Sequence, residues 1–395
     1  MNIVLSERAA RLQPSPTLAV TARAATLKAE GKDIIGLGAG EPDFDTPEHI
    51  KEAAIRAIKA GQTKYTAVEG TLSLRRAVVD KFKRDNGLSY TTSQVLVSSG
   101  GKQSFFNLCQ AVINPGDEVV VPAPYWVSYP EIVAIAGGIP VMPYAGADQA
   151  YRLTPAQLEK SISKRTRLVV INSPSNPTGM AYRRAELLAF GEVLRKHPQV
   201  LIATDDMYEP FIWHGEPFCN ILMACPDLYD RTLVLNGCSK AYSMTGWRIG
   251  YAGGPEAIIK AMGNMQSQST SNPCSISQAA AEAALTGDQE CVRIMCRAFR
   301  ERHEYVHKTL KAMPDVAVLP ADGTFYAFPD FSAAIRRLKL KDDIELCERL
   351  LVDAGVAVVA GLAFGAPGHV RLSFATSMDN LKGALGRIQA FLEKR

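Results

Sequence analysis

Lys240 and Arg248 are the residues whose types and spacing point most directly to chemistry. They lie in the segment N-G-C-S-K-A-Y-S-M-T-G-W-R-I-G-Y at 236–251, directly after an apolar run with strand character. A lysine on a short loop of small residues can present its amine to a cavity, and an arginine binds a phosphate dianion in a fixed bidentate geometry. An amine and a phosphate anchor are the two groups that pyridoxal phosphate requires. Taken alone, such a lysine is ordinarily a solvated surface residue.

Two further motifs follow strand-like runs. S-S-G-G-K-Q at 98–103 places Gly101 and Lys102 where a strand ends and a helix begins. Glycine lets the backbone approach a ligand, and a helix N-terminus offers free N–H groups to an anion, so with Arg248 this motif predicts a phosphate site. By itself it is a tight turn. N-S-P-S-N-P-T-G at 172–179 presents Asn176 to a ring oxygen or a carboxylate, or is an ordinary Pro/Asn turn.

Two adjacent carboxylates follow the strand-like run at 200–204. The motif A-T-D-D-M-Y-E at 203–209 contains Asp205, Asp206 and Tyr208. A carboxylate at the end of a buried strand is costly unless it is paired. Against a pyridine nitrogen it would keep that nitrogen protonated, and Tyr208 would donate to the ring phenolate. The alternative is an aspartate that caps a helix, and the pattern alone does not decide which aspartate points inward.

Trp126 and Arg371 complete the set of candidates. P-A-P-Y-W-V-S-Y at 122–129 offers Trp126 as a flat partner for a planar cofactor, with a core or interface aromatic as an equal alternative. H-V-R-L-S-F-A at 369–375 places Arg371 inside an apolar strand. A buried arginine needs an anionic partner, which is either a substrate α-carboxylate or a structural salt bridge.

Short apolar runs alternate with amphipathic segments along most of the chain. Strand-like runs lie at 95–98, 118–121, 168–172, 200–204, 232–235 and 249–252, and helix-like segments at 103–111, 155–161 and 185–196. This order predicts a mostly parallel sheet with both faces covered. Because such sheets bind ligands at the carboxyl ends of their strands, the motifs are expected to converge there. From about residue 290 long charged helices, such as 293–312, indicate a second, smaller domain.

Length and composition bound the class of protein. The chain has 395 residues, enough for two domains, with 47% hydrophobic and 21% charged residues. A net charge of +4 without a basic run argues against nucleic acid. No stretch approaches the roughly 18 apolar residues of a membrane helix, and the start lacks the apolar core of a signal peptide. The eight cysteines form no C-x-x-C pair and the six histidines are scattered, so we expect free thiols in the cytoplasm and no metal site.

Taken together, these motifs resemble the class I pyridoxal phosphate-dependent aminotransferases of fold type I. The resemblance runs from L-G-A-G-E-P-D-F-D-T-P at 37–47 to H-V-R-L-S-F-A at 369–375, and Q-P-S-P-T at 13–17 and G-G-K-Q at 100–103 make the chain most similar to the bacterial aspartate aminotransferase branch. It implies an α/β fold with a large domain on a mostly parallel sheet and a smaller α+β domain. Residues 1–48 would pack with the small domain, 49–289 would form the large cofactor-binding domain, and 290–395 the small domain.

The resemblance assigns the cofactor ring to five residues. Lys240 is the Schiff-base lysine, Asp205 the partner of the pyridinium nitrogen and Tyr208 the partner of the phenolate oxygen. Asn176 bonds both the ring oxygen and the substrate carboxylate, and Trp126 stacks on the ring. The family more often has D-E-I-Y where this chain has D-D-M-Y, a change that leaves Asp205 in place.

The resemblance assigns the cofactor phosphate to Gly101, Lys102 and Arg248. Three residues before the lysine the superfamily often has serine, whereas this chain has Gly237, so Ser239 is expected to substitute for one phosphate hydrogen bond. Family members are homodimers with shared sites. Tyr65 in K-Y-T-A is therefore expected to reach the phosphate bound by the partner subunit.

The resemblance also implies where an amino acid substrate binds. Arg371 and the backbone of Gly40 hold its α-carboxylate. Lys102 is expected to reach a distal carboxylate, with hydroxyl donors from Ser15 and Thr17 on an N-terminal segment that folds over the site. Some relatives that transaminate prephenate carry an arginine where this chain has Gln13, which argues against that activity here.

The expected activity is a ping-pong transfer of an amino group. An L-amino acid, aspartate or glutamate, would donate to a 2-oxo acid, 2-oxoglutarate or oxaloacetate, with Lys240 as general base. One alternative is an aminotransferase of broader, aromatic or prephenate specificity, and another is a β-elimination lyase on the same fold. A ligand sensor of a transcription regulator would need a DNA-binding domain, and the aminotransferase pattern begins almost at the first residue.

Overall fold

Seven strands form the central sheet of the computed structural model, which describes residues 3–12, 14–213 and 215–393. In spatial order they are β2 (Val95–Ser98), β8 (Gly250–Gly253), β7 (Thr232–Gly237), β6 (Leu201–Asp205), β5 (Thr166–Asn172), β3 (Glu118–Val120) and β4 (Ile139–Val141). All neighbours pair in parallel except β8, which runs antiparallel to β2 and β7. The predicted α/β class with a mostly parallel sheet is confirmed.

The sheet separates two apolar cores, because successive strand residues point to opposite faces. Val95 and Val97 of β2 belong to one core, and Leu96 belongs to the other. The first core contains side chains of α4 (Leu72–Asn86), α8 (Arg184–Arg195) and α11 (Ser275–Thr286). The second contains those of α5 (Gly101–Val112), α6 (Ser128–Ile135) and α10 (Glu256–Ser267). Cover on both faces explains why these strands read as nearly continuous apolar runs.

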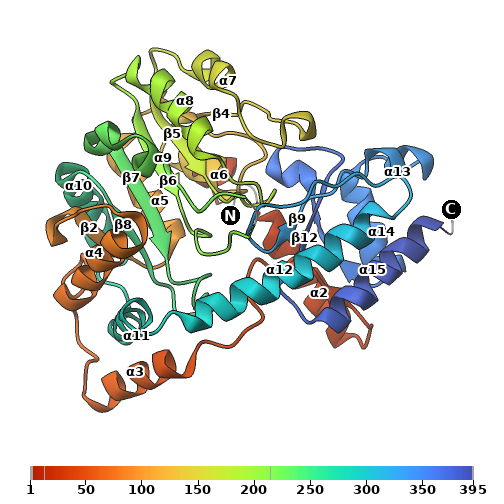
Figure 1. Ribbon diagram of the computed structural model, residues 1–395, viewed down its shortest axis with the longest axis horizontal. Helices are drawn as coiled ribbons and strands as arrows, with labels where there is room; N and C mark the ends of the chain where they lie inside the picture. The colour runs from red at the N-terminus through yellow and green to blue at the C-terminus, as the bar shows by residue number, and fades with distance from the viewer. Residues whose placement is uncertain (1–2, 13, 214, 394–395) are drawn as a thin grey trace.

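A smaller α+β unit follows the large sheet along the chain. Its first element is the long helix α12 (Glu290–Lys311), which runs from beside the large sheet across to the C-terminal elements (Figure 1). An antiparallel sheet has the order β11 (Val359–Ala360), β12 (Val370–Ser373), β9 (Tyr326–Ala327). The helices of this unit after α12 are α13 (Ser332–Arg337), α14 (Asp343–Asp353) and α15 (Met378–Glu393).

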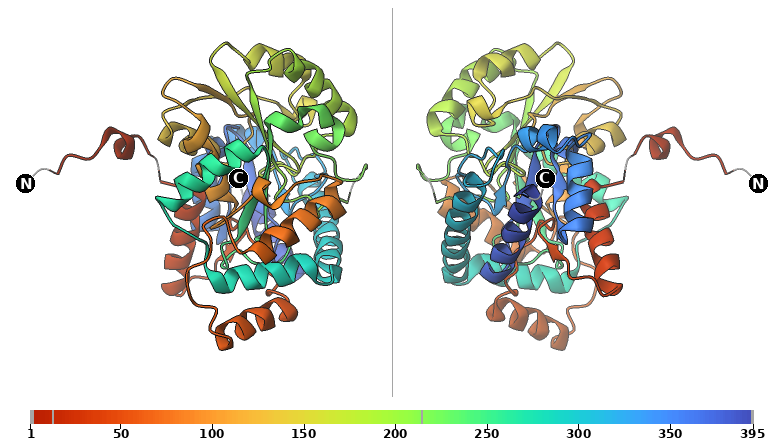
Figure 2. Two further views of the ribbon diagram at one scale, coloured as in Figure 1. Left: turned by 90° about the vertical axis from the view of Figure 1, so that its left-hand side faces the viewer. Right: turned by 90° about the vertical axis from the view of Figure 1, so that its right-hand side faces the viewer.

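The N-terminal segment packs against these C-terminal elements. β1 (Ile35–Gly36) pairs in parallel with β10 (Val356–Ala357), and α2 (Pro16–Ala29) packs beside β10 and β11. The first described residues do not pack in this way. Figure 2 shows them, including α1 (Glu7–Arg11), projecting away from the body of the protein, and Ile3, Val4 and Leu5 are exposed.

The predicted elements are found with boundary shifts of a few residues. The helix expected at 103–111 is α5, which begins two residues earlier at Gly101 and so starts at the glycine motif. Strand β4 was not predicted, because it is a short edge strand that contains Pro140, a residue that edge positions tolerate. Within the described ranges no helix is both long and apolar enough to cross a membrane. The remaining elements are α3 (Glu48–Lys59), α7 (Pro155–Ser161), α9 (Ile221–Ala224), η1 (Thr92–Gln94), η2 (Ala147–Gln149), η3 (Pro226–Arg231) and η4 (Gly361–Phe364).

Candidate active site

A cavity of about 350 Å³ lies at the carboxyl ends of β5, β6 and β7, beside residues of the smaller unit. Its volume falls in the range of roughly 300–1,000 Å³ that is typical of small-molecule sites. The predicted site residues that line it are Thr17, Gly40, Gly101, Lys102, Trp126, Asn176, Asp205, Tyr208, Ser239, Lys240, Arg248 and Arg371. Segments far apart in the sequence therefore meet where an open α/β sheet binds its ligand.

Lys240 follows β7 and presents its amine to this cavity. The Nζ atom donates a hydrogen bond to the carbonyl oxygen of Gly40. The pKa of Lys240 is lowered to about 8, chiefly by burial; Arg248 and Arg371 contribute to the lowering, while Glu41 and Asp205 oppose it. An amine with such a pKa is neutral in a much larger fraction of molecules near neutral pH than an ordinary lysine, so it can act as a nucleophile and a base.

One corner of the cavity, which we call the phosphate corner after its predicted ligand, has the features of an anion site. Helix α5 begins at Gly101, and its N-cap residue, Gly100, has no side chain that could accept from the helix. The first N–H groups of the helix therefore remain available to an anion. The guanidinium of Arg248 reaches this corner with Nη1 2.9 Å from the Thr245 carbonyl oxygen and Nη2 3.4 Å from that of Ser99. A Cβ on Gly100 would lie 2.2 Å from Nη2 of Arg248, so only glycine permits this approach.

Gly237, three residues before Lys240, does not line this cavity. A Cβ on Gly237 would lie 2.9 Å from the carbonyl oxygen of Ile249, so packing between β7 and β8 excludes the serine that the superfamily often has there. Ser239 is buried and lines the cavity. Its predicted bond to a phosphate remains a prediction.

Asp205 and Asp206 point to opposite sides of the end of β6. Asp205 lines the cavity, where its Oδ2 accepts a hydrogen bond of 2.6 Å from the hydroxyl of Tyr129. Burial raises the pKa of Asp205, and the bond from Tyr129 opposes that shift. Asp206 is fully buried away from the cavity and accepts bonds from Thr204 and Asn220. The geometry therefore offers Asp205 to a ligand.

Arg371 forms a second anion site deep in the cavity. It is 2% exposed, and its Nη1 donates to Asn176 Oδ1 at 3.0 Å and its Nη2 to the carbonyl oxygen of Gly38 at 2.7 Å. Its Nε atom is buried and has no hydrogen-bond partner within the described part of the chain. Burial lowers the pKa of Arg371, which shows how poorly its charge is compensated. A carboxylate from a ligand would supply the missing anion.

Aromatic side chains shape the walls between these two anion sites. The hydroxyls of Tyr208 and Tyr326 are 3.0 Å apart, and the guanidinium of Arg371 lies 4.5 Å from the centroid of the Tyr326 ring. On the other side, Nζ of Lys102 lies 5.3 Å from the centroid of the Trp126 ring. Burial and the nearby Arg248 lower the pKa of Lys102. Trp126 therefore offers a flat face with a cation beside it.

Two of the predicted site residues, Ser15 and Tyr65, do not line this cavity. The hydroxyl of Ser15 bonds that of Thr17 at 3.0 Å and lines a neighbouring cavity, whereas Thr17 itself lines the site. Tyr65 is 92% exposed on the loop between α3 and α4. Gln13 lies outside the described residues.

Sequence reasoning missed five residues that line the cavity: Leu18, Tyr129, Asn172, Met207 and Tyr326. Tyr129 and Asn172 lie within quoted motifs, and Asn172 donates through Nδ2 to the backbone of Asp205 at 3.0 Å, but no spacing rule assigns them this role. Met207 fills the space beside Gly101 and Gly237. Tyr326 comes from a two-residue strand in the smaller unit, and only the tertiary contact with Tyr208 identifies it.

Comparison with known proteins gives the family. The family described as aminotransferase class I and II matches residues 32–388. The chain is 60% identical to the aspartate/prephenate aminotransferase of Nitrosomonas europaea, over 98% of this chain and 99% of that protein. It is 48% identical to the aspartate aminotransferase of Geobacillus stearothermophilus, over 99% of each. The crystal structure of the aspartate aminotransferase from Rhizobium meliloti superposes with a TM-score of 0.94 at 46% identity, covering 99% of both chains.

These likenesses extend over the whole catalytic framework described above. The chain belongs to the class I and II aminotransferase family and has the fold-type I architecture of its relatives. It is an aminotransferase, as the motifs around Lys240 predict.

Proposed function

We propose that this aminotransferase uses pyridoxal 5′-phosphate to move the amino group of aspartate or glutamate to 2-oxoglutarate or oxaloacetate. The observation that carries the proposal is the position of Lys240, whose pKa burial lowers to about 8, between a phosphate corner at Arg248 and a carboxylate anchor at Arg371. The relatives named aspartate aminotransferase support the choice of substrate.

The residues of the cavity fit this cofactor. The open first turn of α5 and Arg248 would hold its phosphate, with Ser239 as a further donor. Asp205, fixed by Tyr129, would face the ring nitrogen, and Trp126 would cover one face of the ring. Tyr208 would donate to the ring oxygen, beside Asn176. When bound, pyridoxal phosphate supplies a ring that withdraws the electron pair left at the substrate Cα.

Lys240 moves the proton in this scheme. Its Nζ, neutral in a usable fraction of molecules, is the base within the cavity that can take the proton from the substrate Cα. Burial raises the pKa of Asp205, and the bonds that Tyr129 and the Met207 N–H donate to it oppose that rise and so favour the charged form that would face the ring nitrogen. Donor and acceptor occupy the same cavity in turn, which fits a ping-pong order.

Arg371 and Lys102 would hold the two ends of a dicarboxylate substrate. Arg371, helped by Asn176 and the backbone of Gly40, would bind the α-carboxylate. Lys102 extends into the same cavity as an unpaired cation among the described side chains and would bind the distal carboxylate, with Thr17 and the adjacent Ser15 as hydroxyl donors. A neutral amino acid would leave Lys102 without a partner, so acidic substrates are preferred.

A homodimer in the cytoplasm completes the proposal. Tyr65 is 92% exposed and does not line the cavity of its own chain. This supports its contact with the phosphate corner of a partner subunit. Residues 3–11, which project from the body of the protein in Figure 2, are a second segment that does not pack against its own chain. Sedimentation of the purified protein as a monomer would contradict this assembly.

Prephenate is a second candidate acceptor. The relatives that are 60% and 54% identical are both named aspartate/prephenate aminotransferase. Gln13, where some prephenate users carry arginine, argued against this activity, and that residue lies outside the described part of the structure. The names of the relatives favour testing it directly.

A single screen tests the proposal. Aspartate, glutamate, alanine and phenylalanine are offered as donors to 2-oxoglutarate, and prephenate is offered as acceptor with aspartate or glutamate. We expect the highest kcat/KM with the acidic donors. Equal efficiency with alanine would contradict the acidic preference, and release of ammonia and a 2-oxo acid without an acceptor would indicate a β-elimination lyase.

A further inference from the structure

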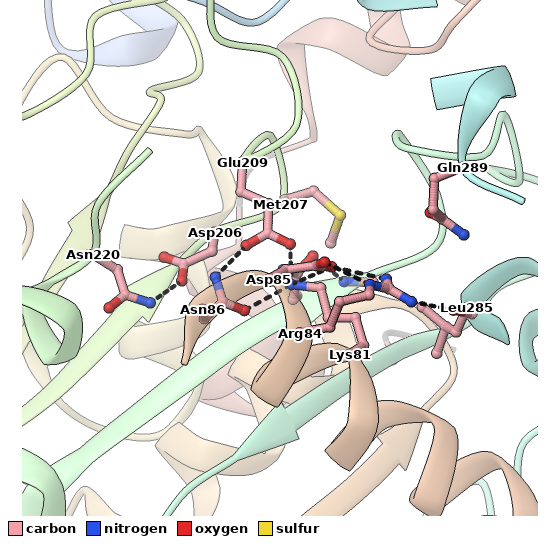
Figure 3. Close-up of polar contacts among 12 residues, drawn as sticks. Lys81, Arg84, Asp85, Asn86, Asp206, Met207, Glu209, Asn220, Leu285 and Gln289 are labelled. Carbon is pink, nitrogen blue, oxygen red and sulfur yellow. Dashed lines mark hydrogen bonds and ion pairs between the residues drawn. The ribbon is translucent and has the colours of Figure 1, made fainter. Parts of the chain in front are cut away.

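The turn at 205–209 has two faces with different surroundings. Asp205 and Tyr208 line the catalytic cavity, whereas Asp206 and Glu209 point the other way into a buried polar cluster (Figure 3). We call this cluster the Lys81 network; it consists of Lys81, Asn86, Thr204, Asp206, Glu209 and Asn220, and none of its members carries an assigned role in the reaction. Asp205 and Tyr208 are thus each followed directly by a residue that faces the network.

An ion pair between helix α4 and the turn at 205–209 forms the centre of the network. Nζ of Lys81, on α4, bonds Oε1 of Glu209 and donates to Oδ1 of Asn86 at 2.9 Å. The other carboxylate oxygen of Glu209 accepts from Nδ2 of Asn86 at 2.8 Å. The side chain of Lys81 is 4% exposed and that of Glu209 10%, while Asp85 lies 3.8 Å from Nζ on the more exposed side.

Asp206 fixes the start of the same turn. Its two carboxyl oxygens bond Oγ1 of Thr204 at 2.6 Å and Nδ2 of Asn220 at 2.7 Å. Asn220 in turn caps α9 by accepting from the N–H of Met223. The N–H of Asp206 donates to the carbonyl oxygen of Leu235 on β7. The turn is therefore tied to a helix, a neighbouring strand and its own strand at once.

Met207 holds the third side of the turn. Its terminal methyl lies 2.5 Å from where a Cβ on Gly101 would be and 3.1 Å from that of Gly237, so it fills the space under the phosphate corner. Any rotation of the turn would move Met207 against α5 and β7 while moving Asp205 and Tyr208 in the cavity.

Buried charge is an expensive way to fill a core. An apolar pair of similar volume is often as stable as a buried ion pair or more so. What the ion pair adds is direction, since hydrogen bonds fix orientations that apolar packing leaves free. A directional anchor is useful at this place because two ligand-facing side chains come from the same five residues.

We propose that Lys81 and Glu209 are positioning residues, which hold the turn at 205–209 so that Asp205 and Tyr208 keep the orientation that the cofactor ring requires. This inference rests on the proposed use of pyridoxal phosphate. In this proposal the network acts on the cofactor ring indirectly, through the backbone of the turn that carries Asp205 and Tyr208.

Four proteins test it: Lys81→Met, Glu209→Gln, the double variant Lys81→Met with Glu209→Leu, and the control Lys196→Met. Lys196 pairs with Glu159 at 2.9 Å on the surface of the large domain, so its loss should change nothing. Each is measured in four ways: thermal unfolding, kcat, the dissociation constant for pyridoxal phosphate, and the pH midpoint of the visible absorption of the bound cofactor.

We expect Lys81→Met to weaken cofactor binding and to lower kcat on the order of tenfold to a hundredfold, as a small misplacement does. The absorption midpoint should rise by roughly half a pH unit or more, because a protonated ring nitrogen and a donor to the ring oxygen both lower the proton affinity of the lysine–cofactor linkage. Glu209→Gln keeps the shape of the side chain and one of its two hydrogen-bond acceptors, so it should fold and show a smaller shift in the same direction.

The double variant separates positioning from stability. With no buried charge left unpaired it should unfold at a higher temperature than Lys81→Met, while its midpoint and cofactor affinity stay displaced. If the midpoint and affinity return together with the stability, or if only the unfolding temperature changes in the single variants, the network is merely structural and the inference is overturned. Failure of the unmodified protein to bind pyridoxal phosphate would overturn the proposed function, and this inference with it.

Discussion

The cationic side chains in the cavity and the one behind it differ in whether a carboxylate pairs with them. Among the described residues, Lys240, Lys102, Arg248 and Arg371 form no ion pair; their contacts are backbone carbonyls, one amide oxygen and aromatic rings. Behind β6, Lys81 is paired with Glu209 and bonded to Asn86. Cations without counterions are ready for anionic ligands, whereas the paired cation fixes the shape around them.

The pKa shifts follow the same division. Burial is the first cause that lowers the pKa of Lys240, Lys102 and Arg371; Glu41 and Asp205 oppose it only in part at Lys240, and no carboxylate opposes it at the other two. A phosphate and a dicarboxylate would supply those negative charges. Since ligands that bind only the folded state stabilise it, cofactor and substrate should each raise the unfolding temperature.

The largest effect is expected from Lys240→Ala. Without this amine the protein lacks the group that we propose as nucleophile and base, so turnover with aspartate and 2-oxoglutarate should be abolished. The phosphate corner and Asp205 remain, so the variant should still bind pyridoxal phosphate non-covalently, as equilibrium dialysis would show. Residual turnover near that of the unmodified protein would exclude Lys240 as the catalytic group.

Asp205 and Asp206 should differ sharply when each is removed. Asp205→Ala takes away the partner of the ring nitrogen, and kcat should fall by orders of magnitude. Asp206→Asn keeps the size and hydrogen bonds of a side chain whose pKa burial raises to about 8, so it should retain most activity. A crippled Asp206→Asn beside a mild Asp205→Ala would reverse the assignment of the two faces.

Lys102→Ala should separate acidic from neutral donors. Loss of a charged hydrogen bond costs about 1.5–3 kcal/mol, so kcat/KM for aspartate should fall roughly tenfold or more by that estimate, while alanine and phenylalanine are spared. An equal loss for all donors would place Lys102 at the phosphate alone.

The smallest effect is a pH dependence of stability in the cofactor-free protein. The folded-state pKa of Lys240, about 8, lies below the ordinary value of 10.5. The folded protein therefore disfavours the charged amine, a cost that is full below pH 8 and disappears as the pH rises to about 10.5. At pH 7 the free energy of unfolding of Lys240→Met should exceed that of the unmodified protein by at most ~3 kcal/mol, and by less because the side chain is partly exposed. The difference should shrink at pH 10. A difference that is independent of pH would contradict the shift.

The sequence predicted the strands of the large sheet well, because each is a short apolar run followed by a polar motif. It missed β4, where Pro140 interrupts the pattern at the sheet edge. The site motifs were readable for the same reason: Lys240, Asp205, Asn176 and Gly101 all follow strands that end at one edge.

What the sequence did not contain is pairing over long distances. Lys81 and Glu209 are 128 residues apart, and Tyr208 and Tyr326 are 118 apart, so no local spacing connects them. The sequence left open which of Asp205 and Asp206 points inward, because that depends on where Tyr129 and Asn220 come to lie.

The most direct test of the central claim is to reduce the purified protein with borohydride in the presence of pyridoxal phosphate and to map the modified peptide by mass spectrometry. Lys240 should carry the cofactor, and the protein should lose its yellow colour on reduction. Attachment at Lys102, the other cavity lysine, or at any residue outside the cavity would contradict the account.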